Sequence, residues 1–462
     1  MNSIPRSGQN DQLQSSVDQF FVRFKVGALL RQRNILKMAG VSCLQVMRFL
    51  FILVFGHKNL YESLRSARLS SGQPAKDVFY RFLNDGRFNW RRLLLLLSLR
   101  IAKLINSLTS PQRERVFIID DSLFSRNRSK AVELLARVRD HVANRYVRGF
   151  RMLTLGWSDG NTFLPVAFSL LSSTNPAHRL QEMAPNLNRR TLAYRRRQES
   201  IQSTPDVLIS LLKQALAAGH RARYVLFDSW FAFPKTICRV QQLGLSVICM
   251  VKAMRNVFYT YQGKRYTLTR LFGAVPKRRG RSKILASLIV TINNSITGTP
   301  LPVKIVFVRD RRQRRKWVAL LSTDVELDDD EIIRIYGKRW DIEVFFKMAK
   351  SYLRLAKEFQ GRSYDMMTAH TTIVCMRYLM LAVASREQAD VRTVGGMFYA
   401  CCDELEDLSF AEALLLIIDL LKQALEKAEV LSEELFQEIV DNFIASLPTF
   451  LRRSLAISGC ES

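Results

Sequence analysis

The 462-residue sequence has few of the patterns that bind zinc or build disulfide frameworks. Its seven cysteines form no C-x-x-C pair, and its five histidines are scattered along the chain. A structural zinc site and a disulfide-stapled fold are therefore not expected, and the cysteines suit a reducing compartment. The signatures of the phosphate loop, the dinucleotide-binding glycine motif, the zinc protease and the serine esterase are also missing. These absences argue against the enzyme classes that depend on them.

Signals for secretion or membrane insertion are also not evident. Residues 1–20 are polar and have no apolar central run. The longest apolar stretch, Met38 to Phe55, is interrupted by Gln45 and Arg48. An arginine near the middle of such a run opposes insertion by about 2.5–3.5 kcal/mol. We therefore expect a cytoplasmic protein without a membrane partner, in which the apolar runs are buried helices.

Acidic residues are too few to balance the basic ones. The chain has 70 lysines and arginines against 41 aspartates and glutamates, which gives a net charge of +29 and a pI of about 10.2. Hydrophobic residues make up 48% of the sequence, enough for folded cores. A folded protein this basic usually meets a polyanion, and nucleic acid is the leading candidate.

The charge is unevenly distributed along the chain. Residues 1–110 carry +12, residues 111–250 carry +11, residues 251–316 carry +16, residues 317–390 carry −2, and residues 391–462 carry −8. The densest positive charge therefore lies in the middle of the chain. We do not expect the acidic C-terminal segment to contact the polyanion.

The apolar periodicity predicts a similar division. Residues 1–110 read as helical, and this basic region could hold duplex DNA or simply present a solvated charged face. Short apolar runs predict strands at 116–119, 151–157, 163–171, 224–227, 284–292 and 303–308, and an amphipathic pattern predicts a helix at 206–218. We expect an α/β core at 111–250 and 326–390, a β-rich basic insertion at 251–325, and an acidic helical region at 391–462.

Two of the expected strands run directly into aspartates. Residues 116–119 lead into Asp120 and Asp121, and residues 224–227 lead into Asp228. Buried strands carry functional groups at their carboxyl ends, so neighbouring strands would place these acids together. Close carboxylates repel unless a cation lies between them, and oxygen ligands favour Mg²⁺ or Mn²⁺. Taken singly, a strand-end aspartate is more often a turn former or a helix cap.

A long helical pattern that begins near residue 331 supplies a third acid. Four polar side chains fall within an arc of about 60° at 100° per residue, namely Tyr336, Arg339, Glu343 and Lys350. Lys347 lies within about 40° of that arc. The plain alternative is an exposed helix with an ion pair between Arg339 and Glu343. Large apolar residues on the adjacent face, such as Ile342 and Phe345, argue instead that the helix packs against a core.

This mixture of side chains suits phosphodiester chemistry. Two metal ions can activate the attacking oxygen and stabilise the leaving oxygen, and three carboxylates supply their ligands. Nearby arginine, lysine and tyrosine side chains can hold phosphate oxygens and offset charge in the transition state.

The segment from Tyr336 to Lys350 matches the Y-x2-R-x3-E-x6-K signature and so resembles the bacterial insertion-sequence DDE transposases of the Y-R-E-K (IS4-type) group. Asp-Asp-Ser at 120–122 and Phe-Asp-Ser-Trp-Phe at 227–231 resemble the family's first and second catalytic-acid motifs. The resemblance covers about residues 75–390. It implies an RNase H-like catalytic core interrupted by a β-rich insertion and flanked by helical regions. A gap of 115 residues between Asp228 and Glu343 leaves room for that insertion.

The resemblance also implies roles for individual residues. By motif position, Asp121, Asp228 and Glu343 would be the catalytic acids and would bind two Mg²⁺ or Mn²⁺ ions. Asp121 is preferred over Asp120 because the family's ligand directly precedes a threonine or serine, here Ser122. DNA contacts would come from the signature helix and from one tryptophan, namely Tyr336, Arg339, Lys350, Lys347 and Trp317. Trp317 would stack on a flipped base or, equally well, pack in a core.

The implied reaction is cut-and-paste transposition. Hydrolysis frees a 3′-hydroxyl, which attacks the opposite strand to give a hairpin and, after the hairpin is reopened, joins target DNA. The implied partners are duplex DNA with terminal inverted repeats, target DNA and a second copy of the chain in a homodimer. The acidic region at 391–462 is the dimerisation candidate, and the protein would be nucleoid-associated. A metal-dependent nuclease of the same fold and a non-catalytic DNA-binding protein derived from a transposase are the alternatives.

Overall fold

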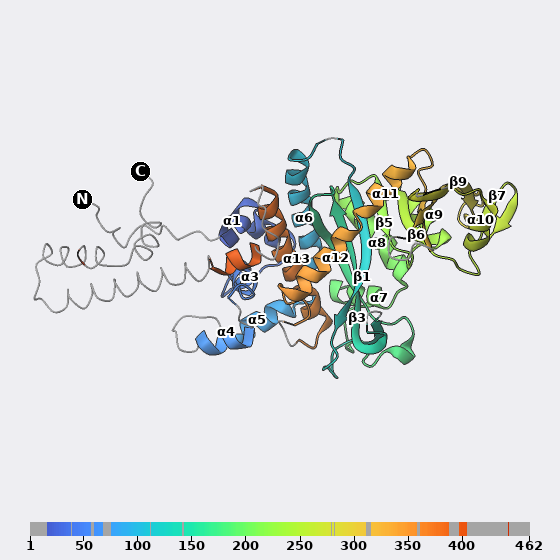
Figure 1. Cartoon of the computed structure of the whole chain (residues 1–462). Coiled ribbons are helices and arrows are strands. Elements are labelled where there is room, and N and C mark those ends of the chain that lie inside the picture. The colour runs from blue at the N-terminus through green and yellow to red at the C-terminus, as the bar shows by residue number, and fades with distance from the viewer. Residues whose placement is uncertain are drawn as a thin grey trace, which may run out of the picture.

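A computed structural model describes residues 16–37, 39–56, 60–67, 75–110, 112–140, 143–278, 280, 282–310, 316–357, 361–387, 397–403 and 442. The expected acidic helical region at 391–462, with its proposed dimer contact, lies almost wholly outside these residues. Figure 1 shows helices at one end of the described part, a twisted sheet in the middle, and the strands of the expected insertion at the other end.

Helices dominate the first part of the chain, as its apolar spacing predicts. They are α1 (Ser16–Arg23), α2 (Val26–Gln32), α3 (Cys43–Ile52), α4 (Leu60–Ala67), α5 (Lys76–Leu83) and α6 (Trp90–Ser107). A capping box starts α3, because Ser42 accepts from the backbone of Gln45 while the Gln45 side chain accepts from the backbone of Ser42. The apolar runs inside α3 and α6 are buried, which agrees with their interpretation as core helices.

One long apolar helix, α13 (Tyr364–Glu387), anchors these N-terminal helices to the rest of the protein. It contacts α3, α5, α6 and α12 (Trp340–Ser351). By length and composition it could cross a membrane, but every residue of its most apolar window is buried inside the protein. Within that window Arg377 donates to the carbonyl oxygens of Leu50 and Phe51 at 2.6 and 2.9 Å. We therefore assign α13 as a core helix.

The centre of the molecule is an eleven-stranded mixed sheet. Its strands are β1 (Val116–Ser125), β2 (Ala136–Asp140), β3 (Arg145–Ser158), β4 (Phe163–Leu171), β5 (Tyr224–Phe227), β6 (Ser246–Val251), β7 (Tyr259–Tyr261), β8 (Lys264–Tyr266), β9 (Ile284–Ile292), β10 (Leu301–Arg309) and β11 (Trp317–Ser322). Their order is β2-β3-β1-β5-β6-β11-β10-β9-β7-β8, and β4 pairs with β3. This mixed sheet with flanking helices is consistent with the expected RNase H-like α/β core.

The register of the parallel strands positions the acids. Val116 lies opposite Tyr224 and Ile118 lies opposite Leu226, so the register offset between β1 and β5 is 108 residues. The same offset carries Asp120, which lies in the middle of β1, to Asp228, which directly follows β5; β1 therefore continues past the expected end at residue 119. Buried β5 and the buried first half of β1 are apolar because both faces of the sheet are covered there.

The segment between β6 and β11 does not form a separate sheet. It contributes β7, β8, α10 (Leu268–Ala274), β9 and β10, and these strands continue the edge of the core sheet. β11 then returns beside β6, with Leu321 opposite Cys249. The strands expected at 284–292 and 303–308 are β9 and β10.

The remaining helices flank the sheet. They are the short 3₁₀ helix at Pro176–His178, α7 (Leu192–Ser200), α8 (Thr204–Ala218) and α9 (Pro234–Gln241). Ser203 caps the start of α8, and Gly219 ends it with a φ of 108°, a left-handed conformation that glycine adopts without strain.

The signature helix differs from its expected form. The sequence pattern predicts one long helix from about residue 331, but the chain forms α11 (Asp329–Gly337) and then α12, which starts at Trp340. Gly337 lies at the end of α11, where its low helix propensity favours the break. Ile342 and Phe345 of α12 are buried against the core, as expected, and α12 contacts β1 and β4.

Candidate active site

The carboxylates of Asp120 and Asp228 form the centre of the candidate site. Burial and the neighbouring charge of Asp228 raise the pKa of Asp120 to about 7. Burial also raises the pKa of Asp228. The charge of Asp228 thus disfavours the charged form of Asp120, and the charge of Asp121 disfavours that of Asp228, a tension that a bound cation would relieve.

Asp121, the first acid expected from motif position, lies in a different environment from Asp120, although its charge also raises the pKa of Asp228. Successive residues of a strand point to opposite faces, and the side chain of Asp121 turns to the face that carries Arg151. Arg151 donates to the two carboxylate oxygens of Asp121 at 2.5 and 2.6 Å. Asp120, on the other face with Ser122, is the acid that lies beside Arg339. Because side chains alternate along β1, only one of the two aspartates can point toward α12. The sequence alone does not say which face of the strand α12 covers.

Arg339 links the first and third acids. Its guanidinium donates to Asp120 over 3.3 Å and also to Glu343, one helical turn further along the chain. The side chain of Arg339 is 16% exposed, and that of Glu343 is 34% exposed. Glu343 is thus held one side chain away from the Asp120–Asp228 pair, with a cation between the acids.

The other signature residues lie in three different environments. Lys350 donates to the hydroxyl of Ser122 over 2.6 Å, and burial lowers the pKa of Lys350. Lys347 is exposed on the outer surface of α12. The Tyr336 hydroxyl is buried close to Arg339 and Asp228, and it makes no hydrogen bond of good geometry within the described part of the chain. A phosphate oxygen or a metal-bound water would satisfy it.

The donor chemistry fits a divalent cation better than it fits a zinc ion. Carboxylate oxygens are what Mg²⁺ and Mn²⁺ prefer, and Asp120 and Asp228 supply them side by side. Across the described residues, no three His, Cys, Asp or Glu side chains already converge into a metal site. Glu343, the third acid of the expected set, instead forms an ion pair with Arg339.

The tryptophans lie in unexpected places. Trp317 packs its ring against Phe272 and Phe307, with centroids 4.9 and 5.0 Å away, so its core-aromatic interpretation describes this structure. Trp230 and Trp340, which lie inside the second-acid motif and the signature segment, are 46% and 58% exposed. Sequence periodicity misses this because Trp230 lies in the turn after β5, where no repeat indicates which side is covered.

Trp230 belongs to a cationic cluster beside Asp228. The guanidinium carbon of Arg151 lies 5.4 Å from its ring centroid, and the ammonium of Lys252 lies 5.1 Å away. Such cation–π contacts steady an exposed ring. Arg151 and Lys252 are functional candidates that lie outside the expected motifs. Arg151 lies two residues before Leu153, the cross-strand partner of Asp121, so its side chain shares a face of the sheet with Asp121.

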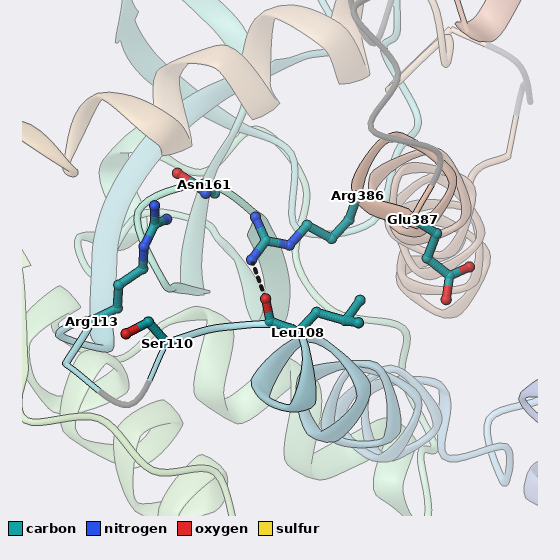
Figure 2. A pocket seen from close by; sticks show the side chains of 6 residues that line it. All are labelled: Leu108, Ser110, Arg113, Asn161, Arg386 and Glu387. Carbon is teal, nitrogen blue, oxygen red and sulfur yellow. Dashed lines mark hydrogen bonds between the residues drawn. The ribbon is translucent and has the colours of Figure 1, made fainter.

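A second polar hollow of about 600 Å³ lies at the other end of β1 (Figure 2). Arg113, Asn161 and Arg386 point into it from three separate segments. Arg386 donates to the carbonyl oxygen of Leu108 over 3.2 Å and also pairs with buried Asp159. Its guanidinium therefore ties the end of α6 to the turn after β3, and we regard this hollow as structural.

Family models match most of the described chain. The model described as "DDE superfamily endonuclease" matches residues 51–281, half of the chain, and the one described as "Archaeal putative transposase ISC1217" matches residues 183–386. Both stretches contain Asp228, and Asp120 and Glu343 each lie within one of them. No curated protein matches the sequence.

Proposed function

Because the chain belongs to the DDE superfamily of endonucleases, we propose that it is the cut-and-paste transposase of an insertion sequence. The observation that supports this most strongly is the strand register that pairs Asp120 with Asp228 beside Arg339 and Glu343. Enzymes of the superfamily generally use divalent metal ions, and these carboxylates are the oxygen ligands that such ions prefer.

In this proposal Asp120, Asp228 and Glu343 hold two Mg²⁺ or Mn²⁺ ions. When bound, the ions supply an activated oxygen nucleophile and charge stabilisation for the leaving oxygen. Asp121 supports the site through Arg151 and is not itself a ligand. Glu343 gives up its ion pair with Arg339 when it binds a metal ion, and the guanidinium of Arg339 is then free to face a phosphate.

The cations of the signature hold the DNA. Arg339 offers a planar pair of N–H groups for phosphate oxygens, and Lys350 adds a point charge next to Ser122. The Tyr336 hydroxyl donates to an oxygen near Asp228. Packing of α12 on β1 and of α11 on β6 and β11 pre-positions these groups, so they stabilise transition-state charge without a large reorganisation.

The remaining parts of the chain receive roles by the same proposal. Residues 1–110 bind the terminal repeats, the basic insertion within 251–325 extends the DNA contact, and 391–462 join two copies in the synaptic complex. Trp317 could stack on a flipped base during hairpin formation only if it left the aromatic cluster with Phe272 and Phe307. The hairpin step is therefore the part of the proposal that most needs its own measurement.

Purified protein with Mg²⁺ and a duplex that carries the element's terminal repeats tests the proposal. We expect cleavage at the repeat end, a hairpin on the released end, and joining of that end to a target plasmid. Asp228→Ala and Glu343→Ala should abolish cleavage while end binding persists.

The same assay separates the alternatives. Cleavage that ignores the terminal repeat would favour a plain metal-dependent nuclease. Binding by the wild-type protein without any cleavage, in Mg²⁺ and in Mn²⁺, would favour a DNA-binding protein derived from a transposase.

A further inference from the structure

A large basic groove opens beside the carboxyl end of β1. It encloses about 1070 Å³ and is walled by the segment after β1 on one side and by the segment after α12 on the other. Six cations line it, namely Arg126, Arg128, Lys130, Lys350, Lys357 and Arg362. No carboxylate is among the described residues of its lining. Four of the cations are exposed at the surface: Arg128, Lys130, Lys357 and Arg362.

The two walls are held together by hydrogen bonds. The part-buried guanidinium of Arg126 donates to the carbonyl oxygens of Gly361 and Ala356, at 3.1 and 3.4 Å. The backbone N–H of Glu133 donates to the carbonyl oxygen of Arg362 at 2.9 Å. The groove is thus a preformed feature of the fold, so its cations are close together before any ligand arrives.

Like charges gathered in this way repel one another. Six cations without a lining carboxylate raise the free energy of the folded protein, because each charge lies within the field of the others. A surface that keeps such a cluster is suited to a polyanion, which offsets the repulsion and releases counterions as it binds.

The groove is continuous with the candidate active site. Lys350 lines the groove and also donates to Ser122, which lies two residues after Asp120 on the same face of β1. A chain of phosphates that passes Asp120 and Asp228 and continues toward the carboxyl end of β1 would therefore enter the groove next.

We propose that this groove holds the phosphodiester backbone of the DNA strand that flanks the scissile phosphate. The inference rests on the proposed function for the position of the cut, while the groove's affinity for DNA can be measured independently. Arg128, Lys130, Lys357 and Arg362 contact successive phosphates, and Lys350 holds the phosphate nearest the catalytic acids.

Charge removal with a matched control tests this. In the groove variant Arg128, Lys130, Lys357 and Arg362 are all replaced by glutamine. The control variant removes the same charge from exposed cations elsewhere, namely Arg189, Arg190, Lys213 and Lys235. Binding of a fluorescent duplex is followed by anisotropy at salt concentrations from about 50 to about 200 mM, where the affinity from phosphate contacts depends strongly on salt. Circular dichroism and thermal unfolding verify that both variants fold.

We expect the groove variant to bind at least about tenfold more weakly at low salt, with a salt slope smaller by about 3. The control should change the slope by less than about 1. Shortening the duplex on one side of the cut should weaken wild-type binding and leave the groove variant unaffected. Equal slopes in the two variants, or equal sensitivity to duplex length, would overturn the proposal.

The outcomes also separate this inference from the proposed function. If wild-type protein fails to cut any DNA but the groove variant loses affinity and salt slope, the groove assignment stands and the transposase proposal falls. If wild-type protein cuts at the repeat end and the groove variant binds like the control, the transposase proposal stands and the groove assignment falls.

Discussion

Arg151 holds the carboxylate of Asp121 in a two-point grip, with hydrogen bonds of 2.6 Å from Nε and 2.5 Å from Nη2. Both side chains are largely buried, with exposures of 24% and 10%. A carboxylate held in this way has its charge offset and its oxygens occupied, so it is poorly placed to accept a metal ion. Its neighbour Asp120 has looser contacts, a backbone N–H of Asp121 at 2.8 Å and the guanidinium of Arg339 at 3.3 Å, and the two residues can be separated by experiment.

Asp120→Asn should abolish Mg²⁺-dependent cleavage, because it removes one of the paired carboxylates. Asp121→Asn should keep measurable cleavage but lower the free energy of unfolding by about 1–3 kcal/mol, since Arg151 loses a charged partner. Cleavage assays and urea unfolding of both variants measure the two effects. Loss of cleavage in Asp121→Asn with normal stability, and full activity in Asp120→Asn, would reverse the assignment.

Divalent cations should stabilise the protein even without DNA. A cation that binds only the folded chain raises its apparent stability with concentration, and the Asp120–Asp228 pair is where the carboxylates repel most. We expect MgCl₂ or MnCl₂ to raise Tm in the wild type and not in Asp228→Asn. Removal of the metal with EDTA should return the wild type to its starting Tm. Equal metal-induced shifts in the two proteins would place the ion elsewhere.

Arg339→Gln should slow cleavage without unfolding the protein. The variant keeps a polar side chain but removes the cation between Asp120 and Glu343, and the loss of one pre-positioned charge commonly slows such reactions by about 10²–10³-fold. Single-turnover cleavage measures this loss. Lys213→Gln, which removes an exposed charge from α8, is the control and should retain most activity.

A buried ionic network far from the acids should dominate stability. Arg197 pairs with Glu133 at 2.5 Å and with Asp365 at 2.8 Å, and all three side chains are less than 10% exposed. Arg197→Met leaves buried Glu133 without its cation, while Asp365 keeps its ion pair with Arg196, and loss of one partner of a buried pair typically lowers the free energy of unfolding by about 3–5 kcal/mol. Chemical unfolding measures the change. Arg189→Met, on the exposed surface nearby in sequence, should change it by less than about 0.5 kcal/mol.

Acidification should destabilise the fold through a buried histidine. Burial lowers the pKa of His220 from 6.5 to about 4, where its ring contacts Ser98 and the carbonyl oxygen of Leu95. The unfolded chain therefore takes up a proton at this residue before the folded one does. Stability is retained above pH 6.5 and falls by about 3 kcal/mol as the pH drops toward 4.

His220→Gln should flatten that part of the pH profile, whatever its stability at neutral pH. Unfolding in urea at pH 7.5, 6 and 5 measures the slope. Buried His370, whose pKa also lies well below its usual value, will keep some of the pH dependence in the variant. An unchanged slope in His220→Gln would contradict the prediction.

Much of the catalytic core could be predicted from local pattern. Strands β5 and β9 occupy the predicted residues, since four and nine apolar or β-prone residues bounded by turn signals leave little choice. The proximity of the strand-end acids followed from parallel pairing. The choice between Asp120 and Asp121 did not, because both lie half-buried and the covering helix comes more than 200 residues later.

Other features depend on contacts that no local pattern records. The break between α11 and α12 interrupts an apolar period that continues through it. Arg197 sits in a run of arginines that reads as a solvated surface, yet it is buried because Glu133 and Asp365 reach it from distant segments. The exposure of Trp230 likewise depends on distant residues, because Arg151 and Lys252 flank its ring.

The strand order also has a consequence for how the protein is made. β6 gains its second neighbouring strand only when β11 pairs with it. Leu321 of β11 lies opposite Cys249 of β6 but 72 residues later in the sequence, and Glu343 follows later still. Because the ribosome synthesises the chain from its N-terminus, the edge of β6 stays unpaired while the basic insertion is being made. The nascent protein therefore carries much of its DNA-attracting charge before it has its third acid, and cleavage competence is among the last properties it acquires.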